Sequence, residues 1–427
     1  MEYYMKKERT PKLHYAWIIF ACCVLLRFGV GGVVGCLAGN FVTPIVNDLG
    51  CGVSQFTLFV SVEAAAMALM YTTAAKMIVK KRINVVLGLA SLLEVAGVAL
   101  MATYKKAFWF NFSGLLLGIG AAFTGFVGIP VIINMWFKKK AGMVLGIIMA
   151  SGYVATVVYS LLSAWLINSF GWRGAYLILA CIGFLLTVPA AFFLLKTPED
   201  VGCDPYGAEN ESEEIQQCPV EEDWGLTKKQ AIRTPMFYMV WLTCMLYSIS
   251  NSVAGYIATY TTMELGQSIT YGASAAMCYN LGCAACSLIL GLLNDKRGVR
   301  TGLVWGTCFA FAGYCCMLMS LHNSGLVIPA ALIIGLGGSM YTVQSPLLVK
   351  STLGSKYYPS IWSVIMVGNS LAGAFSYAPV GMFYDIGGSY RGAFICALGL
   401  FLAAFILGTT SISIKKKYRT SRNTTSN

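Results

Sequence analysis

The sequence predicts an all-α integral membrane protein with twelve transmembrane helices arranged as two bundles of six. Of its 427 residues, 57% are hydrophobic and only 11% are charged, whereas soluble domains carry about 25% charged residues. Long apolar stretches alternate with short polar loops, and the basic residues gather in every second loop. Because a chain in hydrocarbon must bond its backbone polar groups internally, such stretches are expected to be helices.

The individual spans follow from the length that a membrane-crossing helix needs. About 20 apolar residues cross a hydrocarbon core of about 30 Å. The boundary between the third and fourth spans is the weakest, because Lys105 and Lys106 alone separate them. The predicted spans one to twelve cover residues 15–41, 54–79, 84–104, 108–136, 142–168, 173–195, 236–263, 270–293, 301–321, 326–350, 358–384 and 391–413.

A long hydrophilic segment from Thr197 to Thr234 separates the two groups of six spans. Between Glu199 and Asp223 it holds ten acidic residues and no Lys or Arg. Because it lacks helical apolar spacing, we expect most of it to be a mobile linker. The predicted organisation is a first bundle over 1–196, an acidic cytoplasmic linker over 197–234, a second bundle over 235–414 and a basic cytoplasmic tail over 415–427.

The loops differ sharply in basic charge. If the spans alternate in direction, 25 Lys and Arg residues fall on the side of both termini and the linker. Four fall on the other side, namely Lys105, Lys106, Arg173 and Arg391. Since basic loops remain in the cytoplasm, both termini and the linker are expected there.

The same composition argues against other classes of protein. A net charge of +12 would suggest a nucleic-acid partner in a soluble protein, but here the basic residues lie where anionic membrane lipids would meet them. The sequence has no Gly-x-x-x-x-Gly-Lys-Ser/Thr phosphate loop, so ATP-driven pumping is not expected. His14 and His322 are its only histidines and have no metal-ligand companions at suitable spacing. We therefore expect no enzymatic activity, no cofactor and no metal.

The two halves carry a matching motif. GWRGAY at 171–176 precedes span six, and GSYRGAF at 388–394 precedes span twelve. Internal repeats of this kind are typical of secondary transporters, in which two halves rock around a site at the membrane midplane.

The loop after span eight carries a resemblance to a known family. It reads GLLNDKRGVR from Gly291 to Arg300, with Asp295 and Gly298 inside it. This run resembles the signature loop of the major facilitator superfamily, which implies a tight glycine turn and an acid that pairs with a basic neighbour to latch one conformation. The matching run of the first half, AKMIVKKR at 75–82, departs from the signature, because Val79 replaces the acid and Arg82 replaces the glycine.

Further pieces resemble the monocarboxylate porters, and especially the oxalate–formate antiporter group. They are WFKKKAG at 136–142, PEDVG at 198–202, PYG at 205–207 and PVGMFYD at 379–385. The resemblance implies a monomeric carrier of a small carboxylate in a bacterial cytoplasmic membrane, with spans one, four, seven and ten lining the cavity. Oxalate carriers of this group hold the dicarboxylate with an arginine and a lysine, whose positions correspond here to Ser287 and Asn369. Oxalate itself is therefore not expected as the substrate.

Three ionisable side chains lie deep inside predicted spans: Arg27, Glu63 and Glu94. A charge at that depth costs at least ~2.5 kcal/mol, so each should face a partner or water. Arg27 is the candidate anion anchor, because a guanidinium binds a carboxylate through two parallel hydrogen bonds. Glu63 or Glu94 can carry a coupling proton, since burial disfavours the charged carboxylate. Alternatively, Arg27 and Glu63 form a buried ion pair that only orients spans one and two.

A second set of candidates is polar and aromatic. Tyr341 and Gln344 are three residues apart on span ten and are predicted to share a helix face. Pockets for small organic anions commonly combine aromatic walls with a few polar groups, although hydrogen bonding between helices is the alternative role for each residue. The other candidates, on spans seven, eight and eleven, are Tyr256, Tyr279, Asn280 and Asn369.

The leading functional hypothesis is transport of a small organic anion, with a monocarboxylate as the first candidate, by proton symport or anion exchange. One alternative keeps the fold and changes the cargo to a neutral metabolite or an exported drug, with Arg27 only a structural partner. Another is a sensor that does not transport, because a fold alone does not define function. The sequence leaves open the substrate, the coupling ion and the direction of transport.

Overall fold

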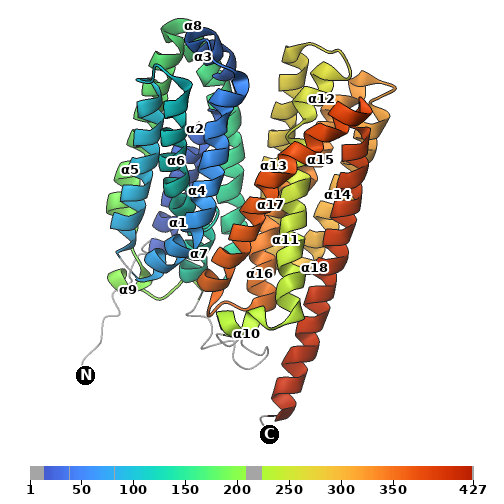
Figure 1. Cartoon of the computed structure of the whole chain (residues 1–427). Coiled ribbons are helices and arrows are strands. Elements are labelled where there is room, and N and C mark those ends of the chain that lie inside the picture. The colour runs from blue at the N-terminus through green and yellow to red at the C-terminus, as the bar shows by residue number, and fades with distance from the viewer. Residues whose placement is uncertain (1–13, 38, 81, 208–223, 426–427) are drawn as a thin grey trace, which may run out of the picture.

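The computed structural model describes residues 14–37, 39–80, 82–207 and 224–425. Helices dominate this part of the chain, and the only bridges between extended segments found in it are two isolated pairs. The first half forms an N-terminal bundle (Figure 1). Its helices are α1 Tyr15–Phe28, α2 Val30–Cys36, α3 Val42–Leu49, α4 Val53–Lys80, α5 Ile83–Met101, α6 Phe110–Thr124, α7 Gly128–Trp136 and α8 Ala141–Leu194.

The second half forms a C-terminal bundle beside the first (Figure 1). Two short helices, α9 Pro198–Val201 and α10 Lys228–Ile232, belong to the segment that joins the bundles. The described chain begins and ends on one side of the molecule, called here the terminal side. The C-terminal bundle contains α11 Pro235–Ala254, α12 Ile257–Met263, α13 Ile269–Arg297, α14 Val299–Met319, α15 Val327–Gly338, a π-helix Met340–Gln344, α16 Ser345–Leu353, α17 Tyr358–Gly387 and α18 Arg391–Thr425.

Ten helical stretches within the described residues are long and apolar enough to cross a membrane. One of them, α8, has 54 residues, which corresponds to about 80 Å at ~1.5 Å per residue. It is kinked at Gly171, where φ is 70° and ψ is 171°. The protein is therefore an all-helical, multi-span membrane protein, and each arm of α8 is as long as one crossing.

The predicted repeat has a structural counterpart on the side opposite the termini. Gly171 and Gly388 both adopt positive φ, 70° and 66°, where the chain turns into the last arm of each bundle. In the first half, Asp48 forms an ion pair of 2.7 Å with Arg173 of this turn. In the second half, Glu264 accepts a hydrogen bond of 2.7 Å from the backbone N–H of Tyr390. An acid that follows the first span of each bundle, Asp48 on α3 or Glu264 at the end of α12, thus binds the residues at the equivalent turn.

Four predicted spans are interrupted rather than continuous. Span one breaks at Gly29, whose ψ of −103° is not helical, and span four breaks between α6 and α7 at Gly125. Span seven divides into α11 and α12, and span ten passes through the π-helix. These are the spans that the family resemblance assigns to the cavity. Where a transporter helix is interrupted near the membrane midplane, backbone groups become available to a ligand and the neighbouring side chains change direction.

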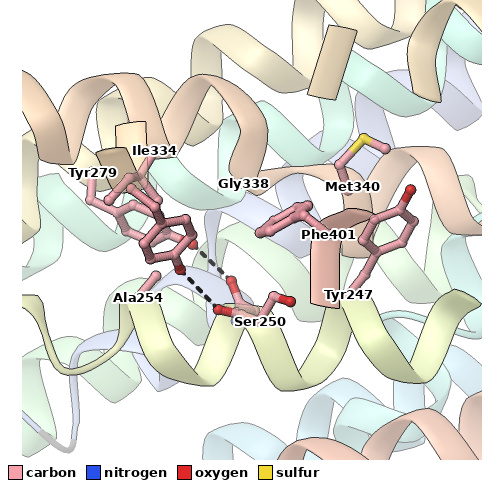
Figure 2. Close-up of a pocket in the computed structure, with 10 residues that line it drawn as sticks. Tyr247, Ser250, Ala254, Tyr279, Ile334, Gly338, Met340 and Phe401 are labelled. Carbon is pink, nitrogen blue, oxygen red and sulfur yellow. Dashed lines mark hydrogen bonds between the residues drawn. The ribbon is translucent and has the colours of Figure 1, made fainter. Parts of the chain in front are cut away.

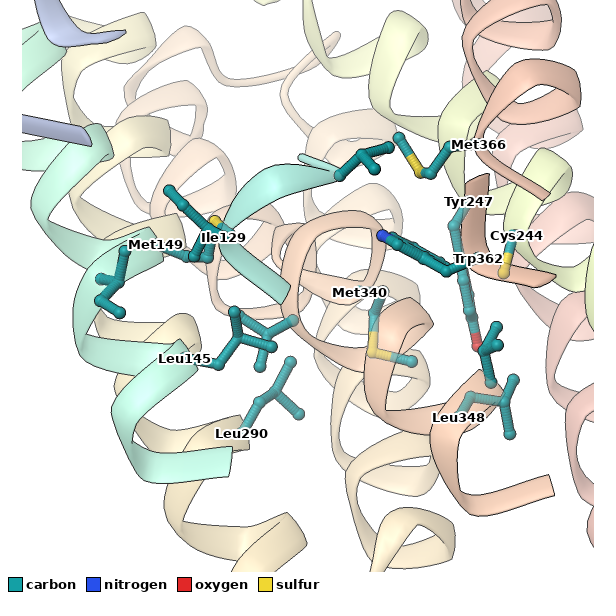
Figure 3. Packing of buried hydrophobic residues seen from close by; sticks show 14 of the residues in the cluster. Ile129, Leu145, Met149, Cys244, Tyr247, Leu290, Met340, Leu348, Trp362 and Met366 are labelled. Carbon is teal, nitrogen blue, oxygen red and sulfur yellow. The ribbon is translucent and has the colours of Figure 1, made fainter. Parts of the chain in front are cut away.

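The two bundles meet through a continuous apolar core towards the terminal side. Ile129, Leu145 and Met149 of the N-terminal bundle belong to the same buried cluster as Leu290 and Trp362 of the C-terminal bundle (Figure 3). A second cluster, formed by α2, α3, α8 and the far ends of α4, α5 and α6, contains residues of the N-terminal bundle alone. Figure 1 accordingly shows the ribbons close together near the terminal side and apart on the other side. The described conformation is closed on the terminal side.

Both described ends of the linker form short capped helices. Thr197 and Asp200 form a reciprocal capping box on α9, and Thr227 and Gln230 do the same on α10. Residues 208–223, which hold most of the predicted acidic run, lie outside the described residues. Helix α18 continues to Thr425, so the predicted basic tail begins inside a helix.

Candidate substrate site between the two bundles

Arg27 lies in the last turn of α1, immediately before the break at Gly29. A Cβ atom added at Gly152 of α8 would lie 2.8 Å from the Nε atom of Arg27. The absence of a side chain at Gly152 therefore leaves space for the arginine side chain. The guanidinium carbon lies 4.6 Å from the centre of the Phe126 ring. Such a cation–π contact contributes about 0.5–2 kcal/mol, and it fixes the direction of the charge without neutralising it.

No carboxylate in the described part of the chain lies within ion-pairing distance of Arg27, and its buried Nε has no hydrogen-bond partner there. The alternative of a closed Arg27–Glu63 ion pair is therefore not what the structure contains. The titratable side chains close enough to interact with the charge are Tyr153, Tyr341, Glu94 and Tyr71. Since the side chain is half-buried, an acceptor from outside the protein can complete its hydrogen bonds.

Phe126 connects Arg27 with the C-terminal bundle. It lies in the break between α6 and α7, where Gly128 packs so closely on the carbonyl of Phe123 that no Cβ would fit. The Phe126 ring contacts that of Tyr341, with 5.1 Å between centres. Its backbone carbonyl accepts a hydrogen bond of 3.0 Å from Trp362 Nε1. The sequence analysis missed Phe126, although the run Gly125 to Gly128 signalled a helix break.

Tyr153 is a second residue that the sequence analysis missed. It lies on α8 one position after Gly152, and its hydroxyl is 3.4 Å from the Thr342 hydroxyl of the π-helix. The contact joins the two bundles at the level of Arg27. Because any relative rocking of the bundles must change this long hydrogen bond, Tyr153 is placed to sense the conformational state.

Glu94 is almost completely buried, with 1% of its surface exposed. The hydroxyl of Thr124, the last residue of α6, donates a hydrogen bond of 2.9 Å to Glu94 Oε2. The carboxyl stem packs against Gly120. Glu94 is therefore held by Thr124, which lies two residues before Phe126 beside the break in span four. The electrostatic neighbours of Glu94 include Glu63 and Arg27.

Glu63 lies on α4, where its backbone carbonyl packs against Gly118 of α6. Its side chain is half-buried, and no hydrogen bond or ion pair involves it within the described residues. A carboxyl group in that setting has no fixed protein partner. Both acids therefore stay candidates for the coupling proton, with Glu94 anchored and Glu63 unanchored.

The structure separates Tyr341 from Gln344. Gln344 is fully buried; its Oε1 accepts from Asn294 Nδ2 at 2.8 Å and its Nε2 donates to the Val299 carbonyl at 2.7 Å. Tyr341 is half-buried and contacts Phe126. The predicted shared face assumed α-helical spacing, but the π-helix changes the number of residues per turn. Gln344 therefore braces the C-terminal bundle, and we remove it from the candidate site.

The remaining candidates of the C-terminal bundle mostly bind one another or the backbone. Tyr279 donates a hydrogen bond of 2.8 Å to Asn251, beside a small cavity inside this bundle (Figure 2). Asn280 donates to its own helix at Ala276, at 2.9 Å. The Tyr256 ring lies 5.6 Å from that of Tyr390. The first contact joins spans seven and eight, the second lies within span eight, and the third joins span seven to the turn before span twelve. None of these contacts reaches Arg27.

Asn369 and Ser287 occupy the positions of the two charges that oxalate carriers use. Asn369 is fully buried, its Nδ2 lies 3.4 Å from Met366 Sδ, and its Oδ1 has no partner within the described residues. Ser287 donates to the backbone of its own helix and bonds Ser339 at 2.8 Å. Neither residue supplies a second positive charge to the site.

The signature loop joins the two bundles through a contact called here the latch, and its partners differ from those expected. Asp295 accepts hydrogen bonds from the backbone N–H groups of Gly142 at 2.9 Å and Met143 at 2.7 Å. These are the first amides of α8 in the other bundle, where a helix leaves its donors free and carries partial positive charge. Arg300 is exposed and forms no ion pair with this acid in the described chain. Gly291 packs against the Gly142 carbonyl, and Gly298, with φ of 82°, ends α13.

The fold and the broken central helices are those of a membrane transporter, and the comparisons with known proteins agree. A family model described as Major Facilitator Superfamily matches residues 23–278 and 240–426. The chain belongs to this superfamily. Its curated relatives include monocarboxylate transporter 12 of Rattus norvegicus, 22% identical over 95% of this chain and 87% of the relative. The same transporter of Homo sapiens is 22% identical over 97% of this chain and 84% of the relative.

A solved structure has a similar fold. A bacterial homologue of the iron transporter ferroportin, crystallised in an outward-facing state with soaked iron, aligns with a TM-score of 0.69. The alignment covers 93% of this chain and 99% of that chain at 12% identity. At that identity the likeness supports the arrangement of helices and says nothing of cargo.

Proposed function

We propose that this protein is a secondary transporter of a small organic anion, with a monocarboxylate as the leading substrate. The observation that carries the proposal is Arg27, a guanidinium between the bundles that has no carboxylate partner in the described chain. The similarity to monocarboxylate transporter 12 supports the same class of cargo. Phe126 and Tyr341 supply aromatic walls beside the charge.

The proposal includes the direction of the chain in the membrane. Ten crossing stretches, the second arm of α8 and the broken helix α11–α12 together make twelve spans. The excess of Lys and Arg in the loops on the terminal side makes that side cytoplasmic. The described conformation is then closed to the cytoplasm, and alternating access requires the contacts between the bundles on that side to open.

A single charge favours monocarboxylates over dicarboxylates. Ser287 and Asn369 replace the two basic residues of oxalate carriers, and both are buried and uncharged. A second carboxylate in the site would be desolvated without a cation, which is costly in a medium of low dielectric. Glu94 or Glu63 would carry the proton in symport, and neither would be needed for exchange of one anion for another.

The test is uptake of radiolabelled small carboxylates into proteoliposomes, together with thermal stabilisation of the detergent-purified protein. Arg27→Gln should abolish uptake and remove the shift in Tm that a bound carboxylate gives to the wild type. Arg391→Gln, an exposed arginine on the side opposite the termini, is the matched control and should behave as the wild type. If Arg27→Gln folds and still binds carboxylates, the anchor lies elsewhere. If the folded wild type binds and transports no carboxylate, the cargo is a neutral metabolite or a drug.

A further inference from the structure

We infer that Tyr206, at the start of the linker, is a positioning residue for the latch between Asp295 and α8. The inference rests on the alternating-access part of the proposed function and not on the identity of the cargo. Tyr206 belongs to neither bundle, and it touches no residue of the C-terminal bundle among the contacts described. Its effect on the latch would pass through the turn of residues 137–140, which joins α7 to α8.

Tyr206 contacts all three lysines of that turn. Its backbone N–H donates to the Trp136 carbonyl at 2.8 Å, and its carbonyl accepts from the amides of Lys138 at 3.1 Å and Lys139 at 3.5 Å. The ammonium of Lys140 lies 6.0 Å from the centre of the Tyr206 ring. Gly207, whose φ is 91°, packs closely against Lys139. A Cβ atom added at Gly207 would lie 2.9 Å from the Cβ atom of Lys139. The turn is therefore bound along its whole length by the linker.

The Tyr206 ring is itself held from the other side. His14 and Trp17 approach its ring edge-to-face, with ring centres 5.5 and 5.6 Å away, and Phe137 lies at 5.8 Å. Aromatic pairs at these separations contribute beyond the area that they bury. The start of α1 thus fixes the linker, and the linker fixes the turn.

The turn needs such support because its last residue is strained. Lys140 is the only non-glycine residue with positive φ in the described chain, at 61°. A side chain in the left-handed region is unfavourable, and such conformations persist only where the surroundings hold them. Lys140 is also the N-cap of α8, so its backbone sets where the amides of Gly142 and Met143 point. Those two amides are the ones that receive the Asp295 carboxylate.

The other end of the linker binds the equivalent turn of the second half. Leu226 donates to the Leu353 carbonyl at 3.1 Å, and Ser355 donates to the Trp224 carbonyl at 3.0 Å. This turn joins α16 to α17, as residues 137–140 join α7 to α8. Asn134 Nδ2 lies 3.4 Å from the Ser355 carbonyl and joins the two turns across the bundles. Since the two ends hold repeat-related turns on the closed side, the contacts of Tyr206 follow the symmetry of the fold.

Hydrogen–deuterium exchange of the purified full-length protein tests the inference. Tyr206→Ala should raise the rate of amide exchange at 141–146 and also at 288–297 of the other bundle. The expected increase is about fivefold or more, because the strain of one left-handed residue changes an equilibrium constant by about that factor. Tyr206→Phe keeps the ring and the backbone contacts and should match the wild type. Asp295→Asn should raise exchange in the same two segments, and the double variant should add little to either single change, because the two residues act on one contact.

Two results would overturn the inference. One is faster exchange in Tyr206→Ala that stays within 136–141, and the other is additive effects of Tyr206→Ala and Asp295→Asn. If Tyr206→Ala does not fold, Tyr206→Leu keeps most of the bulk and removes the aromatic face, with the same expected outcomes. The measurement needs no substrate, so failure of Arg27 as the anion anchor leaves it interpretable.

Discussion

The guanidinium of Arg27 lies over the ring of Phe126, 4.6 Å from its centre, and that ring in turn contacts Tyr341 of the other bundle. A charge in one bundle is thereby connected to the other bundle through one aromatic side chain. The connection is possible because span four is broken at Gly125, which turns Phe126 towards the interface. Substrate binding at Arg27 would therefore act directly on the contact between the bundles.

Replacing Phe126 tests the aromatic wall. Phe126→Leu removes the cation–π contact and leaves an apolar side chain, so the KM for the transported carboxylate should rise about twofold to thirtyfold. Phe126→Tyr keeps the ring and should change KM little. Uptake kinetics in proteoliposomes measure both, and an unchanged KM in Phe126→Leu would contradict the proposed site.

Replacing Gly152 tests the space that Arg27 occupies. In Gly152→Ala the new Cβ would lie 2.8 Å from Arg27 Nε, so the guanidinium must move away from the centre of the site. We expect binding to weaken by tenfold or more, while the Tm falls only slightly, since a glycine-to-alanine change favours the helix itself. Gly399→Ala on α18, where a Cβ meets nothing within 4 Å, is the matched control.

Replacing the buried acids separates the two coupling modes. If Glu94 carries the proton, Glu94→Gln should retain exchange of one carboxylate for another and lose accumulation driven by a pH gradient. Its amide can still receive the Thr124 hydrogen bond, so the fold should survive. Glu63→Gln, measured in the same assay, shows which acid is responsible. Gradient-driven uptake that persists in both single variants would favour anion exchange as the mode of transport.

Gln344 is predicted to act on stability alone. Gln344→Ala removes the hydrogen bonds to Asn294 Nδ2 and to the Val299 carbonyl, each contributing about 0.5–1.5 kcal/mol, while Asn294 keeps its bond to the Leu290 carbonyl. The Tm of the purified protein should fall, and the KM should not change. A raised KM with an unchanged Tm would return Gln344 to the substrate site.

Gly146 is predicted to control closure of the terminal side. Gly146 packs against the Ser287 carbonyl of the other bundle. A Cβ atom added at Gly146 would lie 3.2 Å from the Cα atom of Gly291. In Gly146→Val these backbones cannot approach so closely, so the population closed on this side should fall. Faster hydrogen exchange at 287–295, with the exchange of α14 unchanged, is the expected signature. Unchanged or slower exchange there would mean that the bundles tolerate the added methyl groups, and it would contradict the prediction.

The sequence determined the class of the protein and much of its arrangement. Apolar length and charge are local properties, so the helical membrane fold, the two halves and the depth of Arg27, Glu63 and Glu94 could be inferred from residue order. The signature loop drew attention to Asp295, whose carboxylate contacts the other bundle. It did not identify the partners, because the amides of Gly142 and Met143 have no side-chain signal.

Only the tertiary structure decided which of the buried groups meet. Glu94 and Thr124 are 30 residues apart, and Trp362 bonds the carbonyl of Phe126 across 236 residues. The breaks in spans one, four, seven and ten depend on close backbone packing, and the π-helix moved Gln344 off the face predicted for Tyr341. Residue order determines the periodicity along one helix. The packing of one helix against another determines which side chain enters the site and which only stabilises the bundle.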